Sequence, residues 1–506
     1  MNTPLRRVGL VMLAMVVLLL GNTTYIQLVD ADDYRSDARN QRVLYEEYAR
    51  QRGRIITADE QIIANVKATD DRLRFQRTYA NGPMYAPVTG FYSVRYGATG
   101  LERAEDEILN GSDDRLFVRR LSDLVTGRDP RGGNIVLTVD SRVQKAAYDA
   151  MTRNQFKGAV VAIKPDDGQI LAMVSTPSFD PTGLADHDPD VQEKTYNQYR
   201  DENNPNKPML NRAISDNYTP GSTFKLVTAA AALEDGRDKD TQLMASPGID
   251  VLTGDPCDPS DGSTRCMSNY NDNPCGSGQT ASLATAIELS CNTAFAQLAG
   301  ELGVDKLRDQ AVRFGIGQTD LTIPLSVVPS CIGPLSDGNC LNIPDRPSLF
   351  QSGIGQKDVR VTALENAVVA GTIANDGIRM RPQLVQKILA PDLELISDYH
   401  AEEVGDAMSP SSAEALRDMM ILSEDHTGGD GKRDDIQVAS KTGTAETGAD
   451  PKNTPPFAWY VAFAPAEDPQ VAVAVVVESR DVAATGGKVS AAIGRATMDA
   501  ALARGN

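Results

Sequence analysis

The chain begins with an apolar segment that is long enough to cross a membrane. Arg6 and Arg7 precede a stretch whose apolar character starts at Val8 and ends at Val29. As an α-helix this stretch would extend roughly 33 Å, which is enough to span the hydrocarbon core of a bilayer. No other feature constrains the chain as strongly, because everything that follows must fold on one side of a membrane.

The charges at the two ends of this segment predict its orientation. Arginines precede it, whereas Asp30, Asp32 and Asp33 follow it. Positive charge favours the cytoplasmic side, so we expect residues 1–7 in the cytoplasm, residues 8–29 as a single-pass anchor in the cell membrane, and the remaining chain outside. A cleaved signal peptide is the alternative, because the apolar core is short, but no strong small-residue cleavage site follows it.

The rest of the chain has the composition of an ordinary globular protein. Its 506 residues are 41% hydrophobic and 24% charged, and this length exceeds what one core usually organises, so we expect two or three folded units. The net charge is −19, and no basic stripe is present that could neutralise phosphates. We therefore expect no nucleic-acid partner.

All six cysteines lie in one segment on the predicted exported side. An even number of cysteines outside the cytoplasm favours disulfides over free thiols. No C-x-x-C pair occurs, and the three histidines lie beside acidic or loop residues, so we expect no metal site, no cofactor and no Ser-His-Asp triad. The candidate disulfide cysteines are Cys257, Cys266, Cys275, Cys291, Cys331 and Cys340.

The pattern of apolar residues divides the exported part into two regions. Residues 30–150 are charged and contain two distinct stretches, RGRIITADEQIIA at 52–64 and YGATGLERAEDEILNG at 96–111. In the second region, residues 151–506, two apolar strands joined by a hairpin turn lie within 158–175. Helical stretches separate them from later strands, so we expect a mixed α/β domain whose sheet is completed by distant parts of the chain. The later strand candidates are 439–446, 457–465 and 471–478.

The stretch TPGSTFKLVTAAAALE at 219–234 places Ser222 three residues before Lys225 at the start of an apolar helix. Residues at this spacing share one face of a helix. Burial lowers the pKa of a lysine, and a neutral amine beside a hydroxyl is a base that can activate a serine nucleophile. Taken alone, the pattern also fits a helix start whose lysine reaches out to solvent.

Two further short motifs follow in order, SCN at 290–292 and KTGT at 441–444. A second S-x-N match, SDN at 215–217, lies upstream of Ser222, but the helix-like TAIELS that ends at Ser290 favours the later triplet. Taken singly, SCN is typical of a helix cap, and KTG is typical of a strand that ends in a glycine turn. Only the ordered set indicates a shared site.

In this order, the three motifs resemble the signature of active-site-serine penicillin-recognising enzymes. The chain resembles the class B penicillin-binding proteins over nearly its whole length, most closely the penicillin-binding protein A group of actinobacteria. One difference is that Asp59-Glu60-Gln61 replaces a glycine often found shortly after the RG-x-I motif. The resemblance also rests on RG-x-I at 52–55, YGATGLE at 96–102, NRAISDNYTPGSTFK at 211–225, SGIGQKDVRVTALENAVVAGTIANDG at 352–377 and WYVAFAP at 459–465.

The resemblance implies an architecture of three parts. These are a membrane anchor helix, an elongated N-terminal pedestal domain at 30–150, and a penicillin-binding, serine β-lactamase-like transpeptidase domain at 151–506. The last of these would hold a five-stranded antiparallel sheet flanked by helices, which is a mixed α+β arrangement of the α/β class.

The resemblance also implies the chemistry. Ser222 would attack the carbonyl of the penultimate D-Ala in a D-Ala-D-Ala stem peptide and form an acyl-enzyme, with Lys225 as general base. Ser290 would relay a proton to the leaving D-Ala, supported by the charge of Lys441. Backbone N–H groups of Ser222 and Thr444 would form the oxyanion hole. The expected substrate-binding residues are Asn292, Thr442, Gly443 and Thr444.

The implied function is a monofunctional peptidoglycan D,D-transpeptidase that β-lactams inhibit covalently. Its substrates would be stem peptides of a lipid-linked precursor or nascent glycan, and its partner a SEDS-type membrane glycosyltransferase. One alternative is a D,D-carboxypeptidase or β-lactamase, in which water replaces the acceptor amine. Another is a non-catalytic scaffold for the glycosyltransferase. The anchor and pedestal favour the transpeptidase over a β-lactamase, which needs neither.

Proximity in the sequence suggests how the cysteines pair, although six cysteines allow many connectivities. The middle pair would tie an insert at 246–280, rich in Gly, Pro, Asp and Asn, to the loop that carries Ser290 and Asn292. The expected pairs are Cys257–Cys266, Cys275–Cys291 and Cys331–Cys340.

Overall fold

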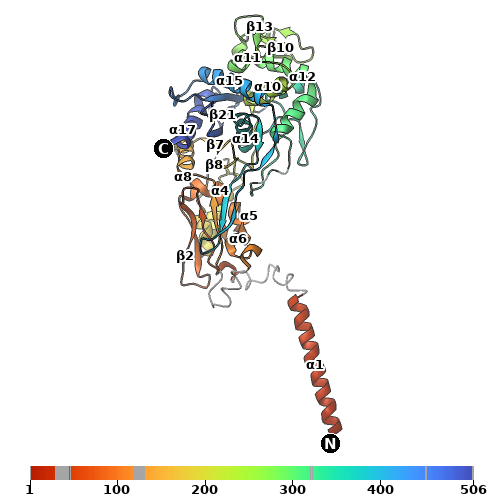
Figure 1. Ribbon diagram of the computed structural model, residues 1–506, viewed down its shortest axis with the longest axis vertical. Coiled ribbons are helices and arrows are strands. Elements are labelled where there is room, and N and C mark those ends of the chain that lie inside the picture. The colour runs from red at the N-terminus through yellow and green to blue at the C-terminus, as the bar shows by residue number, and fades with distance from the viewer. Residues whose placement is uncertain are drawn as a thin grey trace.

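Three parts follow one another along the long axis of the molecule: a single helix, an N-terminal domain and a larger C-terminal domain (Figure 1). The sheet of the N-terminal domain includes two strands from the second half of the chain. The computed structural model describes residues 2–28, 45, 47–117, 131–319, 321, 323–448, 450 and 453–503.

The apolar N-terminal segment forms helix α1 (Asn2–Leu28). Residues Arg6–Ile26 are long and apolar enough to cross a membrane, and none of this stretch is buried against the rest of the protein. Such exposure of large apolar side chains, 72% for Leu18, suits a surface that faces lipid. Val29, where the sequence analysis ends the span, and the aspartates after it lie outside the described residues.

The N-terminal domain is built on a six-stranded sheet in the order β18-β17-β6-β1-β2-β3. β1 and β6 pair in parallel, and the other neighbours pair antiparallel. Two of the six strands come from the second half of the chain, so the sheet is completed only when the C-terminal domain folds. The strands are β1 (Ile55–Ile56), β2 (Ile62–Ala68), β3 (Phe75–Tyr79), β6 (Asn134–Leu137), β17 (Val385–Leu389) and β18 (Leu395–Asp398).

Helices α4 (Gly82–Thr89), α5 (Gly100–Ala104) and α6 (Asp106–Asn110) accompany this sheet. Inside the domain, the buried carboxylate of Glu102 accepts from Arg52 and Arg77, each at 2.6 Å. A buried carboxylate is tolerated only when such partners compensate its lost hydration. The RG-x-I and YGATGLE stretches are therefore joined by one ion cluster.

The turn after the RG-x-I motif keeps a shape that favours glycine. Glu60 has φ 66°, in the left-handed region that side chains rarely adopt. The turn is closed by hydrogen bonds between Thr57 and Gln61 in both directions, each 2.9 Å. The replacement of glycine by Asp59-Glu60-Gln61 therefore leaves a turn in place.

The C-terminal domain contains the predicted five-stranded antiparallel sheet, in the order β20-β21-β22-β7-β8. Both faces are covered, which explains why the central strands are apolar at successive positions and do not alternate. Alternate residues of β22 pack on α14 (Ala363–Ala374) or on α17 (Ala491–Leu502), and α8 (Ser141–Arg153) covers β8 on the same face as α17. The strands are β7 (Lys157–Ile163), β8 (Ile170–Thr176), β20 (Ala439–Ala445), β21 (Phe457–Ala464) and β22 (Val471–Glu478).

A helical region lies beside edge strand β20 (Figure 1). Its centre is α10 (Lys225–Glu234), in which every residue except Glu234 is buried. The predicted insert at 246–280 follows. The three expected disulfides are present, Cys257–Cys266 within the insert, Cys275–Cys291 from the insert to the start of the next helical segment, and Cys331–Cys340 further along the chain. The other helices of this region are α11 (Leu283–Glu288), α12 (Asn292–Phe314), α13 (Arg346–Gly353) and α15 (Pro410–His426).

Candidate active site

The turn that carries Ser222 is a 3₁₀ turn, Gly221–Phe224, which continues into α10. Side chains at i and i+3 eclipse in a 3₁₀ turn, so Ser222 and Lys225 project to the same side. Gly221 has φ 55°, and a Cβ there would lie 2.9 Å from the backbone oxygen of Thr444. A glycine is required because the turn packs directly against strand β20, and Ser222 is left partly exposed at its surface.

Lys225 is fully buried, and its Nζ donates to the backbone oxygen of Ser290 at 2.7 Å and to Oδ1 of Asn292 at 2.8 Å. Burial, and secondly the nearby charge of Lys441, hold the pKa of Lys225 well below its usual range. A neutral amine has two N–H donors, which these two acceptors can occupy. Its lone pair then remains available to accept a proton.

Ser290 lies between the two lysines. Its hydroxyl oxygen is 2.9 Å from Nζ of Lys441 and 3.4 Å from Nζ of Lys225. Ser290 adopts φ 58° in the short connection between α11 and α12. Asn292 begins α12, and its Nδ2 donates to the backbone oxygen of Ser268 in the insert, at 2.9 Å. The SCN triplet thus presents one hydroxyl and one amide to the same buried amine.

Lys441 is buried on β20, and burial lowers its pKa to about 7. The strand continues through Thr442, Gly443 and Thr444 along the edge of the sheet. A Cβ at Gly443 would lie 2.6 Å from the backbone oxygen of Pro220, so this glycine permits the close approach of strand and nucleophile turn. An edge strand keeps backbone groups free to pair with an extended peptide.

The upstream triplet SDN at 215–217 takes no part in this arrangement. Ser215 is exposed, and Nδ2 of Asn217 donates to the backbone oxygen of Pro329 at 3.2 Å. Of the two S-x-N matches in the sequence, only the later one reaches Lys225 and Lys441.

Several supporting contacts were not predicted from the sequence. Gly221 N–H donates to the backbone oxygen of Gly355 at 2.9 Å, and Trp459 Nε1 donates to the backbone oxygen of Thr219 at 2.9 Å. The only tryptophan of the chain and the GIGQ stretch therefore hold the nucleophile turn from behind. The single tryptophan and the closely spaced glycines of GIGQ stand out in the sequence. Their contacts with the turn could not be predicted, because no local sequence pattern indicates a contact between residues that are far apart in the chain.

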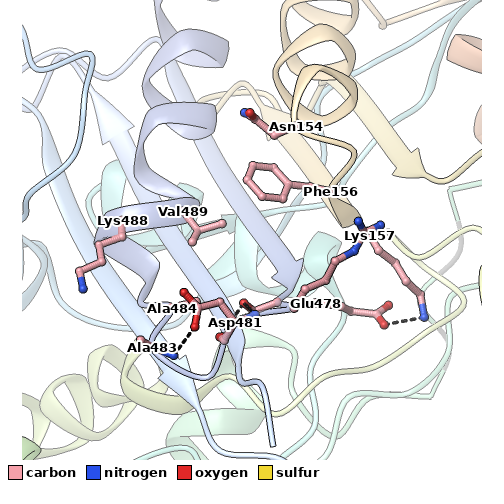
Figure 2. Close-up of a pocket in the computed structure, with 11 residues that line it drawn as sticks. Asn154, Phe156, Lys157, Glu478, Asp481, Ala483, Ala484, Lys488 and Val489 are labelled. Atoms are coloured by element: carbon pink, nitrogen blue, oxygen red, sulfur yellow. Dashed lines mark hydrogen bonds and ion pairs between the residues drawn. The ribbon is translucent and has the colours of Figure 1, made fainter.

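A cavity of about 240 Å³ lies at the end of β22, where Phe156, Glu478 and Val489 are among the residues that line it (Figure 2). Glu478 at its wall is paired with Lys157 at 2.7 Å and accepts from the Tyr218 hydroxyl at 3.1 Å. None of the predicted site residues lines this cavity. Among the described residues, no group of three or more His, Cys, Asp or Glu side chains is placed to hold a metal ion.

A five-stranded antiparallel sheet beside a helical region, with a Ser-x-x-Lys turn, an S-x-N loop and a K-T-G edge strand between them, defines a serine enzyme of the penicillin-recognising class. The chain belongs to the penicillin-binding protein transpeptidase family: the family model of the penicillin binding protein transpeptidase domain matches residues 158–499. The model of the penicillin binding protein A dimerisation domain matches residues 52–135.

Individual relatives agree with this assignment over the whole chain. The chain is 51% identical to peptidoglycan D,D-transpeptidase PbpA of Mycolicibacterium smegmatis, over 100% of both proteins. It is 50% identical to PbpA of Mycobacterium tuberculosis, over 99% of both. Among solved structures, the crystal structure of PBPA from M. tuberculosis matches with a TM-score of 0.83 and 50% identity, covering 90% of this chain and 100% of that one. The ceftriaxone acyl-enzyme complex of penicillin-binding protein A from M. tuberculosis matches with a TM-score of 0.84 and the same identity and coverage.

Proposed function

We propose that this protein is a peptidoglycan D,D-transpeptidase that cross-links D-Ala-D-Ala stem peptides through a serine acyl-enzyme and is inhibited covalently by β-lactams. The observation that carries the proposal is the hydroxyl of Ser290 between the buried Lys225 and Lys441. Ser222 lies partly exposed on the turn that leads into Lys225, and this turn packs against edge strand β20. Relatives that are 50% identical or more are named D,D-transpeptidases, and one of them is described as a ceftriaxone acyl-enzyme.

In the first half-reaction, Ser222 Oγ bonds to the carbonyl carbon of the penultimate D-Ala while its proton passes to Lys225. The peptide C–N bond then breaks, and the leaving amine of the terminal D-Ala receives a proton through the hydroxyl of Ser290, which Lys441 supports. In the second half-reaction, an acceptor amine attacks the acyl carbon, the ester bond to Ser222 Oγ breaks, and the proton that the amine loses returns to Ser222. The new peptide bond is the cross-link.

The edge strand would hold the substrate. Thr442, Gly443 and Thr444 pair with the extended peptide and its terminal carboxylate, and the Asn292 amide binds a substrate amide. The N–H groups of Ser222 and Thr444 stabilise the oxyanion. Loss of one such donor typically raises the barrier by about 3–4 kcal/mol.

In the cell, we propose that residues 1–7 lie in the cytoplasm, residues 8–29 cross the plasma membrane once, and the catalytic domain lies outside. Residues 30–150 form the pedestal and residues 151–506 the transpeptidase domain. Strands β17 and β18 of the second range join the pedestal sheet, and helix α8, most of which lies in the first range, packs on the transpeptidase sheet. The long apolar face of α1 and the pedestal are the surfaces that would meet a SEDS-type glycosyltransferase. Copurification of the two proteins from detergent-solubilised membranes tests that partner, and its absence after crosslinking would contradict it.

Two assays test the enzymatic proposal. Fluorescent penicillin should label the protein, and mass spectrometry should locate the adduct on Ser222. Ser222→Ala should abolish labelling, whereas the exposed Ser215→Ala serves as a matched control that labels normally. An adduct on another residue would refute the assignment.

The second assay supplies purified lipid-linked precursor that has been polymerised by a separate glycosyltransferase. A transpeptidase produces cross-linked peptides that disappear in Ser222→Ala. Release of D-Ala without cross-links would instead show a carboxypeptidase, and neither product would favour the scaffold.

A further inference from the structure

A buried ion pair lies on the side of edge strand β20 away from the catalytic lysines. Arg495 on α17 is 2% exposed, and its guanidinium contacts Oε1 of Glu424 on α15 through Nε at 2.8 Å and Nη2 at 2.7 Å. Replacing a buried ion pair by apolar side chains is often neutral or stabilising, so stability alone does not explain why two charges are buried here.

The second oxygen of this carboxylate reaches two adjacent strands. Oε2 of Glu424 accepts from the hydroxyl of Ser440 on β20 and, at 3.1 Å, from the hydroxyl of Tyr460 on β21. Ser440 is fully buried and immediately precedes Lys441. Glu424 therefore joins helix α15 to strand β20, which carries Lys441, and to its neighbour β21. Lys441 is the lysine that contacts the Ser290 hydroxyl.

The guanidinium of Arg495 also holds the chain segment behind Thr442. Nη1 donates to the backbone oxygens of Gly428 at 3.2 Å, Gly429 at 2.9 Å and Asp430 at 3.0 Å. This segment and Thr442 lie against the same neighbour: a Cβ at Gly487 would be 3.7 Å from the Gly428 nitrogen and 3.9 Å from the Thr442 methyl. The five donors of an arginine suit it to gather several carbonyls at once.

Strand β20 needs support from behind because it is an edge strand. It has a neighbouring strand on one side only, and its other edge is the one that faces the nucleophile turn. We propose that Glu424 and Arg495 are positioning residues, which hold β20 so that Lys441 and Thr442 reach the reacting groups. This inference rests on the proposed function of the same site, and it extends that site to two helices that touch no substrate.

The primary variant removes one link and leaves the ion pair in place. Ser440→Ala removes the hydrogen bond between β20 and Glu424, whereas the contacts of Glu424 with Arg495 and with the Tyr460 hydroxyl remain. A displacement near 1 Å can slow a reaction about 10²-fold, so we expect the acylation rate of the folded protein by penicillin to fall about tenfold or more. Ser440→Thr restores a hydroxyl and should recover most of the rate. Glu424→Gln and Arg495→Lys should slow acylation at least as much.

A matched control comes from the pedestal, where Glu102 forms a similarly buried pair with Arg52. Glu102→Gln should lower the thermal midpoint but leave the acylation rate of the folded protein unchanged. A purely structural role for Glu424 would make Glu424→Gln behave in the same way. Acylation of Ser440→Ala at the wild-type rate would overturn the inference.

Hydrogen exchange of the β20 segment provides a readout that does not depend on activity. Ser440→Ala should speed exchange over 439–445 and leave β8, at the far side of the sheet, unchanged. Faster exchange over 439–445 in Ser440→Ala, together with a wild-type protein that penicillin does not acylate, would refute the proposed function and keep the positioning of β20. Unchanged exchange together with unchanged acylation would refute the positioning and keep the function.

Discussion

At the scale of single residues, the site depends on which groups surround its two lysines. Lys225 meets carbonyl oxygens and a hydroxyl, and the first cause of its lowered pKa is burial. Lys441 is likewise buried, and it lies against the hydroxyl of Ser290. We therefore expect Ser290 to be the group through which a proton moves between the two amines and the leaving group.

Replacing Ser290 by alanine should slow acylation by about 10²–10⁴-fold, the range usually lost with a positioned acid or base. Ser215→Ala should change the rate little, because Ser215 is exposed, whereas the Ser290 hydroxyl lies between the two buried lysines. Stopped-flow measurement of β-lactam acylation at saturating and limiting antibiotic would give both rates. If Ser215→Ala were the slower variant, the upstream triplet would be the functional one.

Glu365 on α14 should make stability depend on pH. It is 4% exposed, and its buried Oε1 has no hydrogen-bond partner among the residues that the structure describes. Burial raises its pKa from 4.5 to about 7, against the opposing charge of Arg379. Between these two values the folded protein binds more protons than the unfolded chain. The contribution of Glu365 to stability is therefore fully present below pH 4.5 and is lost as the pH rises to about 7.

Glu365→Gln should remove this dependence. Above pH 7 the variant should be more stable than the wild type by up to about 3 kcal/mol, since one pKa unit corresponds to about 1.4 kcal/mol. Measuring the thermal midpoints of the wild type and of Glu365→Gln at pH 5 and at pH 8 checks this prediction. The difference between the proteins should be larger at pH 8, and an equal difference at both values would contradict the titration.

At the scale of elements, the insert at 246–280 stabilises the loop that carries Ser290. Cys275 of the insert is bonded to Cys291, and Ser268 of the insert accepts a hydrogen bond from Asn292. Cys291 is also the N-cap residue of α12. The start of this helix, and with it the S-x-N loop, is therefore attached to the insert at two points.

Cys275→Ser should slow penicillin acylation of Ser222 more than it lowers thermal stability. In the entropic account, closing a loop with a sequence separation of 16 contributes roughly 3 kcal/mol, whereas a shift of the loop near 1 Å can cost about 10²-fold in rate. Acylation rates and thermal midpoints under non-reducing conditions would be compared. Removal of the Cys257–Cys266 bridge by paired serine substitutions is the control, since it leaves the S-x-N loop attached. Lower stability at an unchanged rate would contradict the prediction.

At the scale of the whole molecule, the two domains are built from interleaved parts of the chain. Strands β17 and β18 extend the pedestal sheet through β6, although about half the chain separates them (Figure 1). Conversely, α8 precedes the transpeptidase strands but packs on their sheet through Val143, Ala147 and Met151. The pedestal and the catalytic domain therefore support each other's folding.

In helix α1, by contrast, residues Arg6–Ile26 are not buried against any other part of the chain that the structure describes. Deletion of residues 2–28 should release the protein from membranes and leave its acylation rate within about twofold of the wild type, because anchoring and catalysis use separate surfaces. Ultracentrifugation of cell extracts, followed by penicillin labelling of the supernatant, measures both. Continued sedimentation with membranes would point to a second membrane-binding surface, and loss of labelling would show that α1 supports the fold.

The sequence by itself determined the features that depend on neighbours along the chain. The apolar N-terminal helix and the five strands of the C-terminal sheet follow from local patterns of apolar residues, and the spacing of Ser222 and Lys225 is read directly from the sequence. The disulfides were also predictable, because each pair is close in sequence, with separations of 9, 16 and 9.

The sequence favours the later of the two S-x-N triplets, but only the tertiary structure shows that long-range packing brings its serine hydroxyl to Lys225 and Lys441. The same holds for the parallel pairing of the two-residue strand β1 with β6, which is too short to show a period. It also holds for Glu424 and Arg495, which are 71 residues apart. Local sequence limits the secondary structure that each segment can form. Buried charged and polar groups, however, need hydrogen-bond partners, and only the completed fold brings those partners within reach.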